Sequence, residues 1–371
     1  MGSPMGRRKF LGKAGLWSLA AAGFAGGCAR VNLGLKAPEP PRPEAQGFRS
    51  AEPASLYWPH GGPGHWLNPW WPSPLSRANL FKWKFLYRNE FAEARRQPPR
   101  VPVAANAGDY LARPEHSASI TSVGHCTYVI KDGPGTLLTD PHFGPRAFLY
   151  GRHQEPGVPV GKVPGDALAV LSHNHYDHLD AWTVERLAGA AWYVPVGLGE
   201  YLRSLGAKKV VELDWWQSAT HGRWTLTCLP AQHWSNRVGM ARDATLWCAW
   251  MLEAGERRYF YGGDSGYFHG FAEFARKFGP IDVAMLSIGA YEPRWMMRYA
   301  HMNPGEGHQA FLDLKARWML PMHWGVFDLT DEPIDEPPRA LAQAVKEKGG
   351  DMGRVKVLAV GERWEVGQGD G

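Results

Sequence analysis

One short segment concentrates side chains that can bind a metal ion. Residues 171–180 read LSHNHYDHLD and directly follow the apolar residues 167–170. Imidazole and carboxylate groups suit Zn²⁺, Fe or Mn²⁺, whereas a structural zinc site is usually built around thiolates. Strand alternation would put only part of this set on one side, but a turn would let all of it converge. The alternative is a loop that is merely polar. The pattern predicts half of a metal site, with candidate ligands His173, His175, Asp177 and His178.

The remaining ligands should come from the ends of later strands. His233 stands just beyond the predicted strand RWTLTCLPA, and His323 follows the short strand in MLPMHWG. Asp264 follows the aromatic strand in YFYGGDSGY, where neighbouring glycines let the backbone approach a ligand closely. The chain therefore offers a complete set of candidate ligands in the order H-x-H-x-D-H, H, D, H.

The elements that must position these residues follow an alternating pattern from residue 117 onward. Apolar runs predict strands at 117–130, 135–140, 166–172, 190–196, 208–213, 223–231, 245–253, 256–264, 281–289 and 317–325. Helical patterns predict helices at 182–189, 197–206, 270–278, 304–316 and 338–349. Strands with mixed connections and intervening helices imply an α/β layered domain with helices outside the sheets.

The amino terminus has the pattern of a targeting signal rather than of a folded segment. Residues 1–28 pair Arg7 with Arg8 before an apolar stretch and end at Cys28, in the order of a twin-arginine or lipoprotein-like signal. An amphipathic helix is the alternative, and lipidation of Cys28 stays open. A Pro-rich linker, 29–47, follows. We therefore expect an exported protein, periplasmic or anchored to a bacterial envelope.

Residues 48–116 read as an aromatic-rich amino-terminal arm packed on a catalytic domain at 117–371. The run 76–96 permits a helix that Ser76 could cap, with Phe81, Phe85 and Leu86 on one face. The aromatic side chains of the arm could pack in a core or line an apolar groove. They are Trp58, Trp66, Trp70, Trp71, Phe81, Trp83 and Phe85.

Composition narrows the classes of partner. The net charge is +5 and the basic residues are dispersed, so nucleic-acid binding has little support. The cysteines at 28, 126, 228 and 248 form no C-x-x-C pair. We expect the last three to be buried free thiols, although a bridge between Cys228 and Cys248 stays open.

Several segments, in order, resemble one family. VGHCTYVI, LLTDPHF, LSHNHYDHLD, VELDWWQ, QHWS, GDSGY, IGAYEPRWMMRYAHMNPGEG and MHWGVF are similar to the N-acylphosphatidylethanolamine-hydrolysing phospholipase D branch of the metallo-β-lactamase superfamily. The resemblance covers roughly residues 117–330. It implies an αββα sandwich with an amino-terminal arm and a two-metal site at one edge of the sheets.

The resemblance also implies roles for the candidate ligands. One Zn²⁺ ion would be bound by His173, His175 and His233, and a second by Asp177, His178 and His323. Asp264 would bridge the two ions, because a carboxylate between dications lowers their repulsion. A hydroxide bridging both ions would attack phosphorus. The products would be phosphatidic acid and an N-acylethanolamine.

Other residues have roles by the same resemblance. His301 could orient a phosphate oxygen or protonate the leaving alkoxide, beside Asp177 and Asp264 as catalytic residues. Asp140 and His125 would orient metal-bound groups. Substrate contacts are expected from Arg294, Tyr291 and Trp295, although an ion pair is equally consistent with Arg294.

Competing interpretations remain for the function. The same site could hydrolyse a lactone, a cyclic phosphodiester or a β-lactam, because a fold does not determine a substrate. A non-catalytic, lipid-binding envelope lipoprotein is the third possibility. The partners we expect are a phospholipid and a membrane surface, with a homodimer implied by resemblance.

Overall fold

The structure is a computed structural model that describes residues 33–113 and 117–367. They form two compact units, of which the smaller contains residues 33–36 and 77–88 and the larger contains the rest of the described chain. The predicted signal, residues 1–28, lies outside the described residues. Within the part of the chain that is described, no helix combines the length and apolar character needed to cross a membrane.

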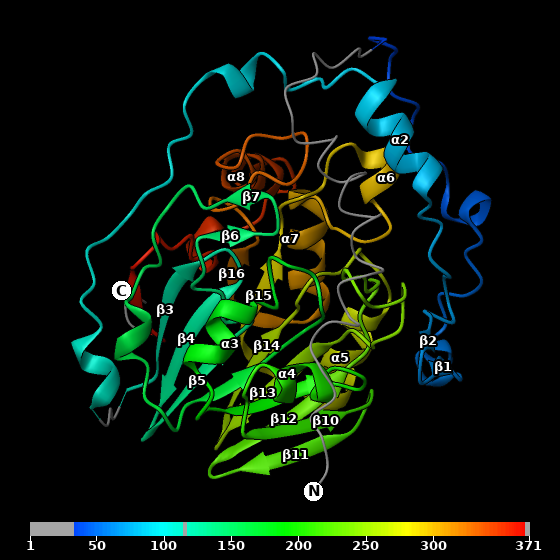
Figure 1. Cartoon of the computed structure of the whole chain (residues 1–371). Helices are drawn as coiled ribbons and strands as arrows, with labels where there is room; N and C mark the ends of the chain where they lie inside the picture. Colours follow the sequence, from blue (N-terminus) through cyan, green and yellow to red (C-terminus); the bar gives the residue numbers. More distant parts are fainter. Residues whose placement is uncertain (1–32, 114–116, 368–371) are drawn as a thin grey trace, which may run out of the picture. The chain divides into compact units, whose positions relative to one another are not determined.

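Two β-sheets form the centre of the larger unit (Figure 1). The first has the order β10-β9-β8-β5-β4-β3-β17 and the second the order β11-β12-β13-β14-β15-β16. The first sheet contains β3 (Ser119–Gly124), β4 (Thr127–Asp132), β5 (Gly135–Thr139), β8 (Leu168–Val170), β9 (Ala191–Pro195), β10 (Lys209–Leu213) and β17 (Arg363–Glu365). The second contains β11 (Ser218–His221), β12 (Trp224–Leu229), β13 (Ala249–Ala254), β14 (Arg257–Tyr261), β15 (Ile281–Ser287) and β16 (Ala316–Met322).

Helices cover the outer side of each sheet. The helices α3 (Ala181–Arg186) and α4 (Gly199–Ser204) share an apolar cluster with the first sheet. The helices α5 (Gly270–Phe278), α7 (Pro304–Asp313) and α8 (Pro337–Glu347) share the main core with the second sheet. The predicted αββα layering is confirmed.

The strand before the ligand segment shows why it reads as a continuous apolar run. In β8 the side chains of Leu168 and Val170 enter the core shared by both sheets, while Ala169, and Leu171 directly after the strand, enter the cluster beneath α3 and α4. Both faces of β8 are therefore buried, as expected for a central strand with parallel neighbours. Its carboxyl end carries the ligand segment to the edge of the sheet.

Short elements complete the larger unit. The two-stranded pairs are β1 (Gly61–Gly62) with β2 (His65–Trp66) and β6 (Arg146–Ala147) with β7 (Tyr150–Gly151). A short helix, α6 (Arg294–Met297), precedes α7. The 3₁₀ turns are η1 (Pro43–Gln46), η2 (Pro53–Tyr57), η3 (Ala94–Arg96), η4 (Asp109–Ala112), η5 (Val160–Lys162) and η6 (Met352–Arg354).

Two predicted elements are wrong in extent. The expected strand 117–130 is two strands, because Gly124 and His125 have φ angles of 114° and 56° and reverse the chain. The helix expected across 76–96 is α2 (Arg77–Phe85), which ends early. The Asn89 side chain accepts a hydrogen bond from the Phe91 amide at 2.7 Å, a local alternative to helix. The strands β11 and β17 were not predicted.

Most of the aromatic arm contributes to packing. Trp66, Trp70 and Trp71 are buried in the main core, whereas Trp58 is exposed. In the smaller unit, the Phe81 and Phe85 rings lie 4.9 Å apart, one helical turn from each other. The prediction of buried free thiols is confirmed for three cysteines, and no disulfide joins Cys228 to Cys248. The three thiols are Cys126, Cys228 and Cys248.

Candidate metal centre

A tight turn brings the ligand segment together. The His178 and Leu179 amides both donate to the His175 carbonyl, at 3.2 and 2.8 Å. This turn replaces strand alternation, so side chains that would have pointed apart converge. Asp180 then caps α3, because its carboxylate accepts a hydrogen bond from the Thr183 amide at 3.1 Å.

Three imidazoles form a first ligand set, consisting of His173, His175 and His233. His173 Nε2 lies 2.8 Å from His175 Nδ1, and His233 Nε2 lies 3.2 Å from the same atom. Two nitrogen donors of one tetrahedral zinc ion lie about 3.3–3.4 Å apart, given Zn–N bonds of about 2.0–2.1 Å. The spacing of this set is therefore close to that of three ligands on one ion.

A second ligand set combines carboxylates with imidazoles and consists of Asp177, His178, Asp264 and His323. The Asp264 carboxylate lies 3.1 Å from both His178 Nε2 and His323 Nε2. The Asp177 carboxylate lies 3.4 and 3.3 Å from the same two nitrogens. The four side chains come from different strand ends or from the ligand turn, and one donor atom of each lies within 4.8 Å of the others.

Asp264 lies between the two sets. Its Oδ2 atom is 4.0 Å from His173 Nε2 and 3.9 Å from His233 Nε2, in addition to its contacts with the second set. Gly263 makes this placement possible, because a Cβ atom there would lie 2.5 Å from the Ser172 side chain. The close backbone approach expected at this glycine-flanked turn is therefore present.

Orphaned polar atoms indicate that the residues present fit metal ions. Asp264 Oδ1, His178 Nε2 and His323 Nε2 are buried and have no hydrogen-bond partner among the described residues. Burying such groups without partners costs several kcal/mol in an apolar medium, on the order of 2–7 for a neutral polar group. Cations held between the sets would satisfy these atoms.

The electrostatics divide the two sets. Burial lowers the pKa of His175 to about 4 and that of His233 to about 3, so these imidazoles are neutral and able to ligate. Burial also opposes the charge on His323, but the Asp264 and Asp177 carboxylates outweigh it and raise its pKa to about 9. The second set is thus a place where the two carboxylates favour positive charge.

Several site residues adopt a backbone conformation that L-residues rarely take. The φ angles are 56° for His125, 31° for Asp140 and 67° for His323. Such conformations cost about 1–3 kcal/mol each and persist only where the surroundings enforce them. One enforcing contact is the His323 amide, which donates to the His125 carbonyl at 3.1 Å. Strain gathers here at the candidate centre.

Asp140 holds one ligand in orientation. Its carboxylate accepts hydrogen bonds from His178 Nδ1 and from the Tyr261 hydroxyl, both at 2.6 Å, and from the Ser172 amide at 2.6 Å. With Nδ1 engaged, His178 presents Nε2 to the second set. His125 does the same for a carboxylate, because its Nε2 lies 3.1 Å from Asp177.

We expect Asp140→Asn to weaken metal binding and hydrolysis by about 10–100-fold, as is typical when the partner of a ligating histidine is altered. The amide can no longer accept all of these hydrogen bonds, so His178 loses its fixed orientation. Metal content after dialysis and the hydrolytic rate would measure the effect. Asp282→Asn, which changes a carboxylate on β15, serves as the control. Unchanged metal affinity in Asp140→Asn would contradict the role.

His301 reaches the centre from the segment after α6. Its Nδ1 lies 3.8 Å from the Asp264 carboxylate, and its ring centroid lies 5.2 Å from that of His233. The Ala300 carbonyl accepts a hydrogen bond from His233 Nδ1 at 3.0 Å, which ties this segment to the first set. The structure thus brings His301 to the candidate centre.

The expected substrate contacts are engaged within the protein. Arg294 donates to the Glu306 carboxylate at 2.8 Å and to the His301 carbonyl at 2.9 Å. The Tyr291 hydroxyl donates to Glu336, and Trp295 is buried. Arg294 therefore supports the segment that carries His301.

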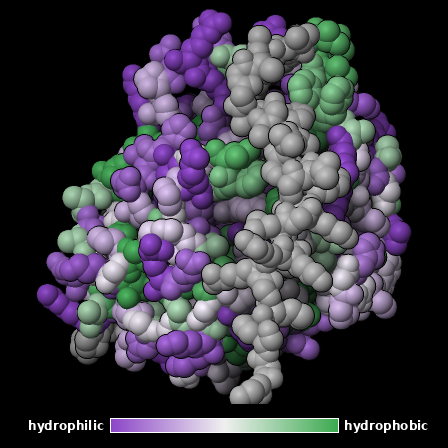
Figure 2. Space-filling model, in the orientation of Figure 1, coloured by the Kyte–Doolittle hydropathy of each residue, from purple (hydrophilic) through white to green (hydrophobic). Residues whose placement is uncertain are grey.

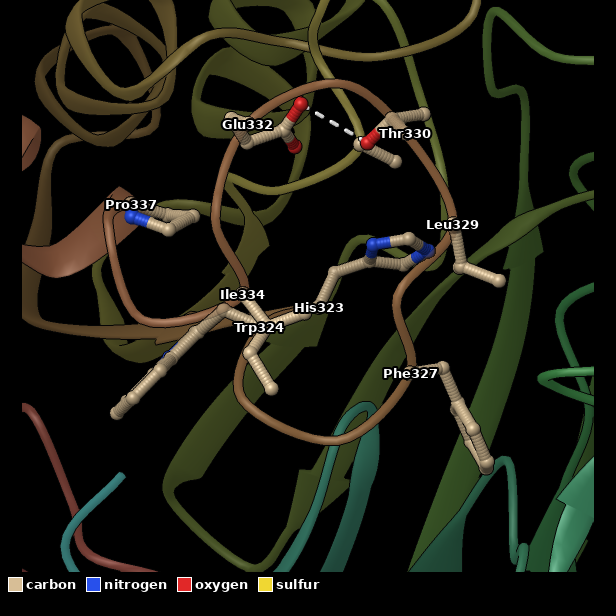
Figure 3. A pocket seen from close by; sticks show the side chains of 9 residues that line it. His323, Trp324, Phe327, Leu329, Thr330, Glu332, Ile334 and Pro337 are labelled. Atoms are coloured by element: carbon tan, nitrogen blue, oxygen red, sulfur yellow. Dashed lines mark hydrogen bonds between the residues drawn. The ribbon is translucent and has the colours of Figure 1, made fainter. Parts of the chain in front are cut away.

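A small cavity lies behind His323 (Figure 3). Its volume is about 10 Å³, and Trp324, Phe327 and Glu332 contribute to its lining. The Glu332 carboxylate accepts hydrogen bonds from the Thr330 hydroxyl at 2.9 Å and from the Tyr291 amide at 3.1 Å. These contacts brace the loop behind one ligand.

Sequence reasoning missed several residues of the centre. Tyr261 and Ser172 anchor Asp140, and Cys126 lies beside the second set. Alternation along β14 could have indicated an inward-facing Tyr261, since Tyr259 and Tyr261 share one face. No sequence signal distinguished Cys126 from an ordinary buried thiol.

Comparison with known proteins gives consistent matches. A model described as a β-lactamase superfamily domain matches residues 136–324. An uncharacterized protein of Mycobacterium tuberculosis is 34% identical over 72% of this chain and 73% of its own. The N-acyl-phosphatidylethanolamine-hydrolyzing phospholipase D 1 of Caenorhabditis elegans is 32% identical over 66% of this chain and 75% of its own. A solved metallo hydrolase of Ignicoccus hospitalis shares the fold, with a TM-score of 0.52 at 19% identity over 67% of this chain and 97% of its own.

Proposed function

This chain belongs to the β-lactamase superfamily and is a metal-dependent hydrolase, and from that premise we propose that it is a phosphodiesterase of phospholipase D type. Its substrates would be N-acylphosphatidylethanolamine-like phospholipids, cleaved to phosphatidic acid and an N-acylethanolamine. The observation that carries the proposal is the 32% identity with the nematode phospholipase D over 75% of that protein.

The donor sets support two ions, and we propose zinc for both. The first set offers three neutral imidazoles and the second offers two imidazoles with two carboxylates. When bound, two such ions supply Lewis acidity and an activated water nucleophile. The chain itself would orient the phosphate and hold Asp264 between the sets. His301 would donate a hydrogen bond or a proton to the oxygen of the leaving alcohol.

A cavity near the first set supports a lipid substrate. It has a volume of about 300 Å³ and is lined in part by Phe48 and Trp71 of the arm and by Phe268. Gln232, which directly precedes the ligand His233, also lines it. Glu44, Arg298 and Glu306 also line the cavity, so it could accept an acyl chain on its aromatic side and a polar group on the other.

An exposed apolar patch adjoins the ligand turn. It consists of Phe148 and Leu149 between β6 and β7, Tyr150 at the start of β7, and Val238, which is 74% exposed. The Phe148 ring stacks on Tyr176 of the ligand turn at 4.7 Å. The Tyr176 hydroxyl accepts a hydrogen bond from the Val238 amide at 3.1 Å. Figure 2 shows hydrophobic side chains gathered on this face where Figure 1 places β6 and β7.

Exposed apolar side chains beside the exposed Arg146 make an anionic lipid surface the occupant that we propose for this patch. Residues 145–153 and 236–242 form its two loops, in which Arg146 is exposed, whereas Arg237 is buried and Arg242 pairs with Asp243 at 3.2 Å. Apolar side chains flanked by arginine bind anionic interfaces through burial and electrostatic attraction together. We therefore propose that the patch places the candidate centre against a membrane.

We expect the Leu149→Ser/Val238→Ser double variant to bind anionic phosphatidylglycerol vesicles about 10–100-fold more weakly, from the apolar area it no longer buries. Vesicle co-sedimentation measures this. Val211→Ser/Leu312→Ser removes two similarly exposed apolar side chains outside the patch and should bind like the parent protein. If both double variants bound the vesicles equally weakly, the patch would not be the membrane-binding surface.

The decisive test of the function is a lipid-class screen with the zinc-loaded protein, reading released products by mass. N-acylethanolamine and phosphatidic acid from N-acylphosphatidylethanolamine are the expected products. Hydrolysis of only a lactone, a cyclic phosphodiester or a β-lactam would replace the phospholipase by another ester hydrolase. Less than one zinc ion per chain, without hydrolysis of any phosphodiester, would favour a lipid-binding lipoprotein.

Export and self-association complete the proposal. The twin-arginine order of residues 1–28 supports an exported protein, periplasmic or anchored at the envelope, where phospholipids are at hand. A homodimer is proposed from the family resemblance. Both can be tested on the whole protein, by cell fractionation and by sedimentation velocity.

A further inference from the structure

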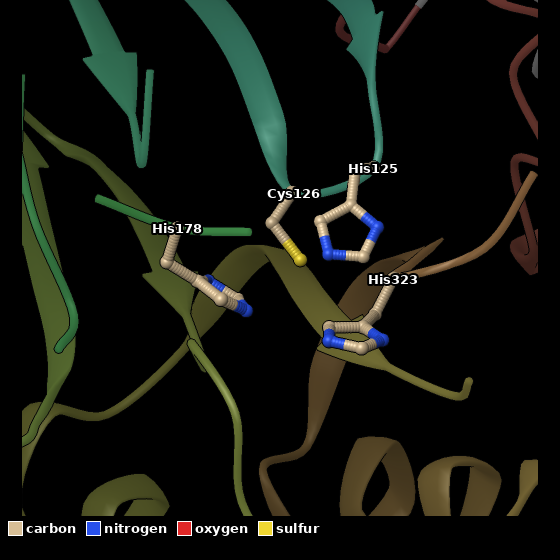
Figure 4. A group of neighbouring side chains, drawn as sticks. All are labelled: His125, Cys126, His178 and His323. Carbon is tan, nitrogen blue, oxygen red and sulfur yellow. The ribbon is translucent and has the colours of Figure 1, made fainter. Parts of the chain in front are cut away.

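One buried thiol lies beside the second ligand set. Cys126 stands in the turn between β3 and β4, next to His125. Its Sγ lies within 4.8 Å of ring nitrogens of His125, His178 and His323. Figure 4 shows the sulfur pointing toward the gap between the His178 and His323 rings. Two of these three histidines belong to the second set, so the thiol faces that metal position.

The backbone fixes the thiol from both sides. The His125 carbonyl accepts a hydrogen bond from the His323 amide at 3.1 Å, and the Cys126 carbonyl accepts one from the Thr139 hydroxyl at 2.8 Å. The next hydroxyl, that of Thr127, donates to the Asp140 carbonyl at 2.8 Å. The turn that carries Cys126 is therefore tied to one ligand, His323, and to Asp140, which orients another.

The three buried cysteines have different environments. Cys248 Sγ donates to the Leu171 carbonyl at 3.7 Å and is also hydrogen-bonded to Cys228. Among the described residues, Cys126 Sγ has no such hydrogen bond. A packed thiol without a specific role would account for Cys126 on burial alone. It would not account for a sulfur that points between the rings of two candidate ligands, His178 and His323, whose Nε2 atoms lie beside the Asp264 carboxylate.

We propose that Cys126 is an additional ligand of the second metal ion, which would then have a mixed donor set of sulfur, nitrogen and oxygen. The inference rests on the proposed two-metal site. Cys126 would be the fifth protein donor of that ion, and sulfur and nitrogen donors of a five-coordinate zinc ion lie roughly 3.1–3.8 Å apart. Ion binding would therefore draw Sγ inward by up to about 1.7 Å from the 4.8 Å limit. His125 stays outside the set, because its Nε2 is engaged by Asp177.

Two consequences follow from thiolate ligation. The S–H proton leaves to solvent when the metal–sulfur bond forms, so binding of the second ion releases one more proton than histidine and carboxylate ligands would. A soft donor also favours Zn²⁺ or Cd²⁺ over Mn²⁺ or Mg²⁺. The second position should thus discriminate between metals more strongly than the first.

Cobalt spectroscopy tests the ligand directly. With Co²⁺ in both positions, the full-length protein should show a near-ultraviolet thiolate-to-cobalt charge-transfer band that appears with the second ion. Cys126→Ser and Cys126→Ala should lose the band. Cys228→Ser, which changes a buried thiol outside the metal groups, should keep it. Should neither Cys126 variant fold, the Cys28→Ala/Cys228→Ala/Cys248→Ala triple variant decides, because Cys126 is then the one remaining cysteine and a band that persists is assigned to it.

The possible results separate this inference from the function on which it rests. A protein that binds two cobalt ions and hydrolyses phosphodiesters without the band would overturn only the role of Cys126, as would a band that survives in Cys126→Ala. If the protein binds no cobalt, the proposed two-metal site itself is wrong. Loss of the band in both Cys126 variants, with two ions still bound per chain to Cys228→Ser, supports the assignment.

Discussion

Asp264→Asn should reduce hydrolysis by more than about 100-fold and leave fewer than two ions per chain, since even partners outside the ligand set cost about 10–100-fold. Asp264 Oδ2 lies within 4.0 Å of donor nitrogens in both sets. An asparagine keeps the shape but removes the negative charge that lies between the two metal positions. Repulsion between two dications would then go uncompensated.

The measurement pairs metal analysis with the rate of hydrolysis of a phosphodiester. Asp166→Asn is the matched control, because Asp166 is an exposed aspartate before β8, at the opposite end of this strand from the ligand segment. It should keep both ions and the full rate. Asp264→Asn with two ions and an unchanged rate would show that the centre does not depend on a carboxylate between its sets.

The layered fold could be predicted because its signals are local. The central strand β8 is buried on both faces, and this produces the apolar run that marks it in the sequence. The strand β17 could not be predicted in the same way. It is short and pairs with β3, which lies far from it in the chain, so only the tertiary fold makes Arg363–Glu365 a strand. The apolar pattern alone did not indicate the β3–β4 turn, because a histidine, rather than a glycine, occupies one of its positive-φ positions.

The candidate ligands could be predicted because each stands at a strand end or in one dense motif. Their supporting contacts could not. Tyr261 belongs to the second sheet and Asp140 directly follows a strand of the first, and nothing in either local sequence specifies the hydrogen bond between them. Arg294 has the charge expected of a phosphate ligand, but its ion pair with the half-buried Glu306 becomes visible only in the fold. Spacing therefore identifies donors, whereas long-range packing decides how they are held.

His301→Ala should slow hydrolysis of a phospholipid by about 10²–10⁴-fold, the usual contribution of a positioned acid or base. The segment that carries His301 is hydrogen-bonded to the two segments that carry the candidate ligands His233 and Asp264. The Ala300 carbonyl engages His233, and the Met302 amide donates to the Ser265 carbonyl at 3.0 Å. This leaves the imidazole 3.8 Å from Asp264, close enough to meet a phosphodiester held at the two sets.

The leaving group distinguishes proton donation from metal binding. The leaving group of a p-nitrophenyl phosphodiester is p-nitrophenolate, which departs without needing a proton. His301→Ala should therefore lose far less activity on this substrate than on an alkyl diester. His301 also lies in a group with His233 and Asp264 that could hold an ion, so metal content must be measured together with the rate. His65→Ala, which alters an exposed histidine on β2 outside the ligand sets and the apolar patch, should match the parent on both substrates. Equal losses on both substrates, together with loss of an ion, would make His301 a metal ligand instead of a proton donor.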